Sequence, residues 1–108
     1  MVEMIPIPLG HGTAVGITVR LPRTTLLVAA TDAGYLMCGA LDVRLLDERL
    51  ASRAIVAARA VGVRTIDELL AAPIDDLTSA AAALGLTRGM PGREALERML
   101  AATPAPQG

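Results

Sequence analysis

The chain has 108 residues, 53% hydrophobic and 19% charged, and these proportions predict one folded domain over most of the length. All ten basic residues are arginine and eleven residues are acidic, so the formal charge of −1 argues against the basic surface that binds nucleic-acid backbones. The absence of lysine excludes Schiff-base chemistry and a P-loop lysine, because both need an ε-amine.

The location expected for the protein is the cytoplasm. One cysteine cannot form a disulfide within the chain, and the N-terminus lacks the basic and apolar regions of a signal peptide. The longest stretch without a formal charge, Met4–Val19, is interrupted by prolines and glycines and is too short to span a bilayer. No membrane partner is therefore expected.

The first forty residues predict a four-stranded antiparallel meander. Thr13–Leu21 alternates apolar with small or polar residues, as a half-buried strand does, and its apolar face is Val15, Ile17, Val19 and Leu21. The other predicted strands are Val2–Ile7, an edge strand limited by its prolines, and Thr25–Thr31 and Tyr35–Cys38. Asp32-Ala33-Gly34 is a short hairpin signal before the fourth strand, in which Gly34 is able to adopt a positive φ.

The middle of the chain changes to helical spacing. Apolar residues recur at helical intervals over Asp42–Arg53, which predicts an amphipathic helix with Asp42 as its N-cap. Ala54–Val63 is small and β-branched and is predicted as a fifth strand, although its alanine content would equally suit a helix.

The remaining residues predict three helices. Thr65 and Glu68 fit a capping box, and Pro73 ends the short helix that follows. A second helix is expected over Asp75–Leu84 and a third over Gly92–Ala101.

Together these elements predict an α+β domain over residues 1–102, in which an antiparallel meander and one further strand pack with a central amphipathic helix and a C-terminal helical cluster. Within it, residues 1–41 form a β-rich oligomerisation region and residues 42–102 are mostly helical. Residues 103–108 are expected to be a frayed tail.

The composition also predicts self-association. With twenty alanines and Tyr35 as the one aromatic residue, each buried position removes little apolar area from water. Part of the apolar surface is therefore expected to be buried against other subunits, and the meander adds an exposed edge strand. A general bias toward alanine is the alternative explanation of the composition.

Four separate blocks of sequence resemble the YunC-like proteins of bacteria and archaea. They are Gly34-Tyr35-Leu36-Met37-Cys38-Gly39, Leu41-Asp42, residues 59–66 and residues 92–96. The resemblance covers nearly the whole chain. It implies an α+β domain whose N-terminal β region mediates tetramer formation, and it implies no established activity, substrate or cofactor.

One candidate site lies where the fourth strand meets the first helix, with Tyr35, Cys38 and Asp42. Arg59 lies in an apolar run, where an unpaired guanidinium would be costly to bury, so a partner is expected. A salt bridge to Asp42 or another acid is the favoured hypothesis. The other is that Arg59 and Arg64 hold a small anionic ligand near this junction.

Two further functions stay open at this point. A cysteine- or arginine-dependent enzyme would use the same site, but His11, the one histidine, lies in a glycine loop, and a buried, unreactive Cys38 is favoured. One Cys and one His are also too few for an ordinary metal site. Residues 62–101 are similar to helix-hairpin-helix DNA-binding modules, yet residues 64–98 contain four arginines against six acids.

Overall fold

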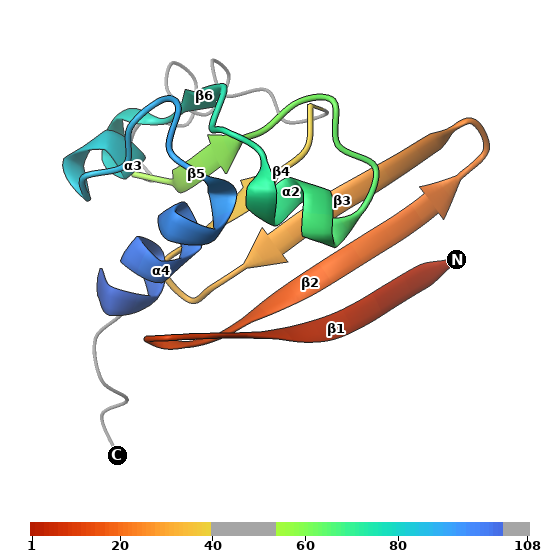
Figure 1. Ribbon diagram of the computed structural model, residues 1–108, viewed down its shortest axis with the longest axis horizontal. Coiled ribbons are helices and arrows are strands. Elements are labelled where there is room, and N and C mark those ends of the chain that lie inside the picture. Colours follow the sequence, from red (N-terminus) through yellow and green to blue (C-terminus); the bar gives the residue numbers. More distant parts are fainter. Residues whose placement is uncertain (40–53, 103–108) are drawn as a thin grey trace.

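The computed structural model describes residues 1–39 and 54–102, and their path is shown in Figure 1. The strands in these ranges are β1 (Val2–Leu9), β2 (Gly12–Leu21), β3 (Thr24–Ala30), β4 (Gly34–Met37), β5 (Val56–Arg59) and β6 (Asp76–Leu77). The helices are α2 (Ile66–Ala71), α3 (Ser79–Ala83) and α4 (Gly92–Ala102). The helix predicted over Asp42–Arg53 and the tail predicted from residue 103 lie outside the described residues.

The described strands form a single six-stranded sheet in chain order. Neighbouring strands are antiparallel except β4 and β5, which are parallel. The predicted α+β class and the antiparallel meander are therefore confirmed. The fifth strand is also present, but it is shorter than the predicted Ala54–Val63, and β6 was not predicted.

Prolines occupy the outer edge of β1. Met1 and Arg20 exchange two backbone hydrogen bonds, of 2.8 and 3.2 Å, and the bonded pairs of an antiparallel ladder alternate from there. The intervening residues of β1, whose backbone groups point away from β2, are Val2, Met4, Pro6 and Pro8. Because proline has no N–H, this edge carries outward donors only at Val2 and Met4.

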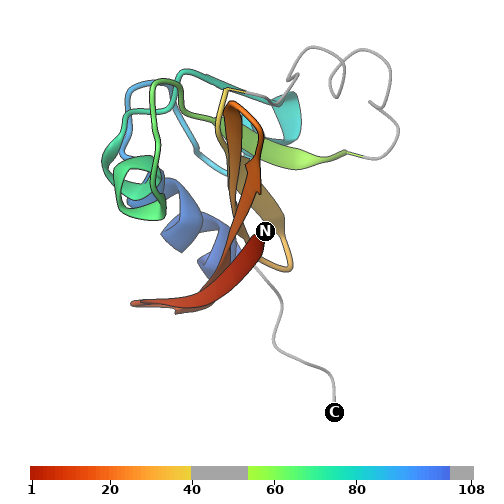
Figure 2. The same ribbon diagram turned by 90° about the vertical axis from the view of Figure 1, so that its right-hand side faces the viewer.

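Helices α2 and α4 lie on the same side of the sheet, as Figure 2 shows. The β2 residues beneath them are small: Ala14 is fully buried and Gly16 is buried. A Cβ on Gly16 would lie 3.1 Å from side-chain atoms of both Ile5 and Ile7 and 3.5 Å from Ile66 of α2. The small residues of β2 on this face therefore allow the helices to approach this strand closely.

The opposite face of the meander carries the bulkier apolar side chains of β2. Strand pairing places eight apolar residues next to one another on this face. They are Val2 and Met4 of β1, Val15, Ile17, Val19 and Leu21 of β2, and Leu26 and Val28 of β3. We call this surface the open face. Val2 is 62% exposed, Met4 67%, Val15 37% and Leu21 49%, and the other four members are half-buried. The alternation predicted for β2 is thus confirmed, but the helices cover the small face and not the Val/Ile/Leu face.

The turn before β4 is organised by Thr31 and not by a left-handed glycine. The Thr31 hydroxyl accepts hydrogen bonds from the backbone N–H groups of Ala33 and Gly34 and donates to the carbonyl of Gly34. Gly34 does not adopt the positive φ that glycine permits. It is small because β5 passes close by, since a Cβ there would lie 2.2 Å from the carbonyl oxygen of Val56.

The capping box at the start of α2 is confirmed. The Thr65 hydroxyl accepts a hydrogen bond from the Glu68 N–H at 3.1 Å, and the Glu68 carboxylate accepts from the N–H of Arg64 at 2.7 Å. The carboxylate thus reaches one residue further back than the motif predicts.

The helix predicted over Asp75–Leu84 is wrong in its first half. Asp76–Leu77 forms β6 beside β5, and the helix begins only at Ser79. Thr78 separates the two, because its hydroxyl caps α3 by accepting from the Ala81 N–H and also accepts from the Ala57 N–H of β5. The predicted stop at Gly85 is confirmed by its φ of 93°.

Helix α4 is close to its predicted span, and its buried residues include Ala95, Leu96 and Met99. It begins at Gly92, where a Cβ would lie 2.4 Å from the carbonyl oxygen of Leu69 and 2.7 Å from the side chain of Leu36. The start of α4 therefore fits between α2 and the sheet because residue 92 has no side chain.

Candidate functional site

The structure brings two of the predicted site residues together on one face of the sheet. Tyr35 of β4 pairs with Ala57 of β5, and Met37 pairs with Arg59 two residues further along. Successive residues of a strand alternate between faces, so Tyr35 and Arg59 point to the same side. Tyr35 and Met37 pack against the fully buried Ala57 there.

Arg59 forms the salt bridge that was expected, with Asp75 as its partner. Its Nε and Nη2 donate to the same oxygen of Asp75, at 3.1 and 2.6 Å, and Nη2 lies 3.9 Å from the carboxylate of Asp76. The Arg59 side chain is 27% exposed, so the pair is only partly screened by water. Asp42, the partner named from the sequence, lies outside the described residues.

A second arginine extends this charge cluster. Nη2 of Arg88 donates to Asp76 at 2.8 Å, and this hydrogen bond is the main reason why the pKa of Asp76 falls below its ordinary value, while burial opposes the shift. The pKa of Arg88 is raised by the same bond. Arg59, Asp75, Asp76 and Arg88 therefore form a cluster with no net charge beside the edge strand β6.

Cys38 lies on the opposite face from Tyr35 and Arg59. It is 6% exposed, belongs to the main core and accepts a hydrogen bond from the Leu27 N–H through its Sγ at 3.5 Å. Leu27, the residue bonded to Cys38, pairs with Thr18 of β2. His11 precedes β2 and is seven residues from Thr18, which at the rise of a strand is about 23 Å. The geometry therefore favours a buried, unreactive thiol without a histidine base.

Arg64 is also separated from Arg59. It lies in the exposed loop before α2 and lines a hollow of about 220 Å³ together with Thr18 and Arg20 on the helix-covered side of β2. Arg20 is already paired with Glu3. Among the described candidates, Tyr35 and Arg59 therefore share one face of the sheet, whereas Cys38 and Arg64 lie away from it.

The glycines of the suggested helix-hairpin-helix are occupied by hydrogen bonds within the domain. The Gly92 N–H donates to the carbonyl of Ala72 at 3.0 Å, and the Gly89 N–H donates to that of Ile74 at 2.9 Å. Backbone donors that would contact phosphate in such a module are thus already satisfied. Together with the acidic balance of these residues, this argues against nucleic-acid binding.

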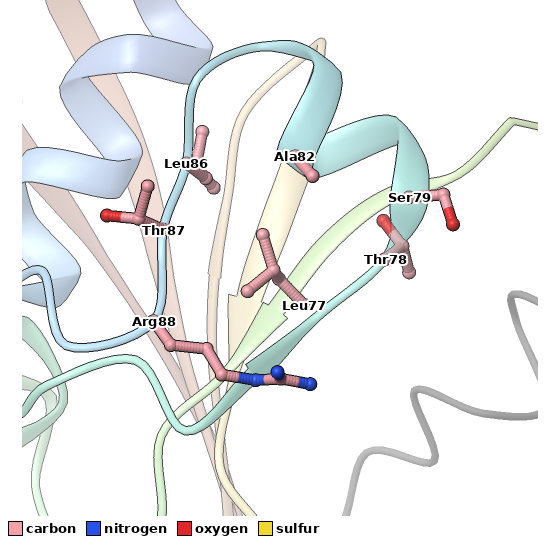
Figure 3. A pocket seen from close by; sticks show the side chains of 7 residues that line it. All are labelled: Leu77, Thr78, Ser79, Ala82, Leu86, Thr87 and Arg88. Carbon is pink, nitrogen blue, oxygen red and sulfur yellow. The ribbon is translucent and has the colours of Figure 1, made fainter.

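Another hollow, of about 430 Å³, lies between β6, α3 and the loop at residues 86–88 (Figure 3). This region differs from the sequence prediction, because the helix predicted over Asp75–Leu84 includes the residues that form β6. The sequence does contain a signal for a later helix start. Thr78, which follows the acidic pair Asp75 and Asp76, is a favoured N-cap residue and indicates that the helix begins after it.

Within residues 1–39 and 54–102, no group of three His, Cys, Asp or Glu side chains is placed to hold a metal ion. Over the same ranges, no helix combines the length and the apolar character that crossing a membrane requires.

Comparisons with known proteins agree with the predicted resemblance. The uncharacterized protein YunC of Bacillus subtilis (strain 168) is 54% identical over 100 residues, which cover 93% of this chain and 99% of that protein. The crystal structure of TA1206 from Thermoplasma acidophilum, a protein of unknown function, superimposes with a TM-score of 0.82 at 24% identity, covering 92% of this chain and 93% of that one. Residues 37–99 match the family described as "Domain of unknown function (DUF1805)". The chain therefore belongs to this YunC-like family of unknown function.

Proposed function

We propose that the protein works as a homo-oligomer, with a tetramer as the expected assembly, and that its copies associate through the open face. The single observation that carries the proposal is the exposure of Val2, Met4, Val15 and Leu21 on one continuous face of the meander. Contiguous exposed apolar patches on soluble domains commonly mark interaction surfaces. The N-terminal position of this face agrees with the tetramer that the family resemblance implies.

The exposed area is large enough to matter energetically. The exposed fractions of these four side chains amount to about two whole side chains, each contributing roughly 1.5–3 kcal/mol when buried. Two stacked copies would then gain about 6–12 kcal/mol, to which the half-buried members of the face add. Because association itself costs several kcal/mol, we expect dissociation constants on the order of micromolar.

The test is a mass measurement across a concentration series. Light scattering or sedimentation should give a mass well above the 11.1 kDa of one chain at micromolar concentration. A wild-type protein that stays monomeric there contradicts the proposal.

A pair of variants on the same strand locates the contact. Met4→Glu places a carboxylate on the open face, which removes about 1–2 kcal/mol of apolar burial per copy and adds the cost of burying a charge. We expect the dissociation constant to rise at least about 100-fold. Ile5→Glu is the matched control, because Ile5 is 45% exposed on the opposite face and its variant should assemble like the wild type. Equal effects of the two substitutions would argue against this face.

For Arg59 we propose a structural role. Its bonds to Asp75 support a salt bridge that joins β5 to the residues leading into β6, and they leave the ligand hypothesis at Tyr35 and Arg59 with less support. The buried position of Cys38 likewise gives little support to a cysteine-dependent enzyme.

A further inference from the structure

The hollow beside β6 has an apolar floor and a cation at its rim. Figure 3 shows the Leu77 side chain in the hollow, with Ala82 of α3 and Leu86 of the following loop on one side of it and the guanidinium of Arg88 on the other. Leu86 is almost fully buried, Leu77 is half-buried and Ala82 is exposed. The volume of the hollow, about 430 Å³, lies within the range of small-molecule sites.

The Arg88 guanidinium has N–H groups that are not used in its bond to Asp76. Its side chain is 70% exposed, and among the described residues only Asp76 accepts a hydrogen bond from it, through Nη2. A guanidinium has five N–H donors, so most of its hydrogen-bonding capacity faces water and the hollow. Two parallel N–H groups of a guanidinium match the two oxygens of a carboxylate in geometry.

The surrounding charges limit what the hollow accepts. Arg88 is linked through Asp76 and Asp75 to Arg59, and these four side chains sum to zero charge. A ligand with one negative charge leaves this cluster with a charge of −1, whereas a doubly charged phosphate would leave it at −2, and Arg88 is the one cation among the described residues that line the hollow. A single carboxylate is therefore favoured over a phosphate.

We infer that this hollow binds a small carboxylic acid with an apolar body, whose carboxylate pairs with Arg88 and whose apolar part lies on Leu77, Ala82 and Leu86. None of the described residues that line the hollow belongs to the open face. Loss of one leaves the other measurable, since ligand binding is read from titration and assembly from mass.

The experiment is a titration of methyl-labelled wild-type protein with octanoate, followed by NMR. We expect saturable shifts of the Leu77, Ala82 and Leu86 methyl signals, with a dissociation constant on the order of 0.1–1 mM for a ligand of this size. Octanamide, which has the same chain without the charge, should bind about 10-fold more weakly, because charge-assisted hydrogen bonds are the stronger ones. Equal affinity for the two probes, or shifts confined to Leu21 and Leu26 on the open face, would overturn the inference.

Three variants separate the cation from the floor. Arg88→Gln should weaken octanoate binding about 10-fold, whereas Arg93→Gln, an exposed arginine of α4 that does not line the hollow, should leave it within about twofold. Ala82→Leu keeps Arg88 but fills the hollow, and it should weaken octanoate and octanamide alike by about 10-fold or more. Unchanged octanoate affinity in either Arg88→Gln or Ala82→Leu would show that the ligand does not bind here.

Discussion

The hydroxyl of Thr78 joins three segments of the chain, and its removal should be costly. It donates to the carbonyl of Ile55 at 2.6 Å and accepts from the N–H groups of Ala57 at 3.2 Å and Ala81 at 3.3 Å. The residue is 2% exposed, so water cannot replace these bonds. We predict that Thr78→Val, which keeps the shape and removes the hydroxyl, strongly destabilises the fold.

The magnitude follows from the groups left without partners. Loss of an N-cap costs roughly 1 kcal/mol, and a buried donor without an acceptor costs about 1–3 kcal/mol. The expected loss in the free energy of unfolding is therefore about 2–4 kcal/mol, which should lower the urea midpoint by roughly 1–3 M for a domain of this size.

Far-UV circular dichroism is the suitable measurement, because the chain has no tryptophan and a single tyrosine. All proteins must be compared at one concentration, since assembly raises apparent stability. Thr78→Ser is the control that keeps the hydroxyl and loses a methyl group, and it should cost only about 0.5–1.5 kcal/mol. If Thr78→Val unfolds within about 0.5 kcal/mol of the wild type, or Thr78→Ser is the worse of the two, the reasoning is refuted.

Three other predictions concern the close backbone contact at Gly92, the ion pair of Arg59 with Asp75, and the dependence of stability on pH. Gly92→Ala should lower the free energy of unfolding in urea by several kcal/mol, because the new Cβ meets the Leu69 carbonyl. The control Gly62→Ala lies in open space at a φ of 74° and should lower it by only about 1 kcal/mol. Similar losses in the two variants would contradict this prediction. Arg59→Met should lower stability by about 1–2 kcal/mol, and its effect should be less than additive with that of Asp75→Asn in a double-mutant cycle. Because the folded-state pKa of Asp76 is lowered from 3.8, its ionised carboxylate stabilises the fold above that pH, and the contribution is lost as the pH falls through the lower, folded-state value. Acid titrations of stability should therefore decline less steeply below about pH 4 in Arg88→Gln than in the wild type, and identical slopes would contradict the assignment.

Local signals predicted most of the elements. The alternation in β2 and the bond from the Glu68 N–H to Thr65 depend on neighbours within a few residues, and both were read correctly. The helices α2 and α4 pack closely on β2, and close packing requires small residues on the covered face. The covered face is therefore that of Ala14 and Gly16, and not that of the bulkier β2 residues. A rule that buries the more hydrophobic face of each strand fails for β2, because the larger side chains of this strand lie on the open face.

The charge cluster could not be predicted for a different reason. The need for a partner at Arg59 was evident from its apolar neighbours, but the identity of that partner depends on β6 pairing with β5. Asp76 and Leu77 fit helical spacing equally well, and only the tertiary contact with β5 makes them a strand. Tyr35 and Arg59 lie on the same face of β4 and β5, whereas Cys38 follows Met37 by one residue and so points to the other side.

Pro6 and Pro8 have a consequence for how far association can proceed. A bare edge strand is a template on which further chains add strand by strand, and such growth has no natural end. Here an incoming strand would find donors only at Val2 and Met4, because the next two outward positions have no N–H to offer. Fibre-like extension along β1 is thereby disfavoured, while stacking of faces is unaffected. The two prolines thus favour particles of finite size over fibrils.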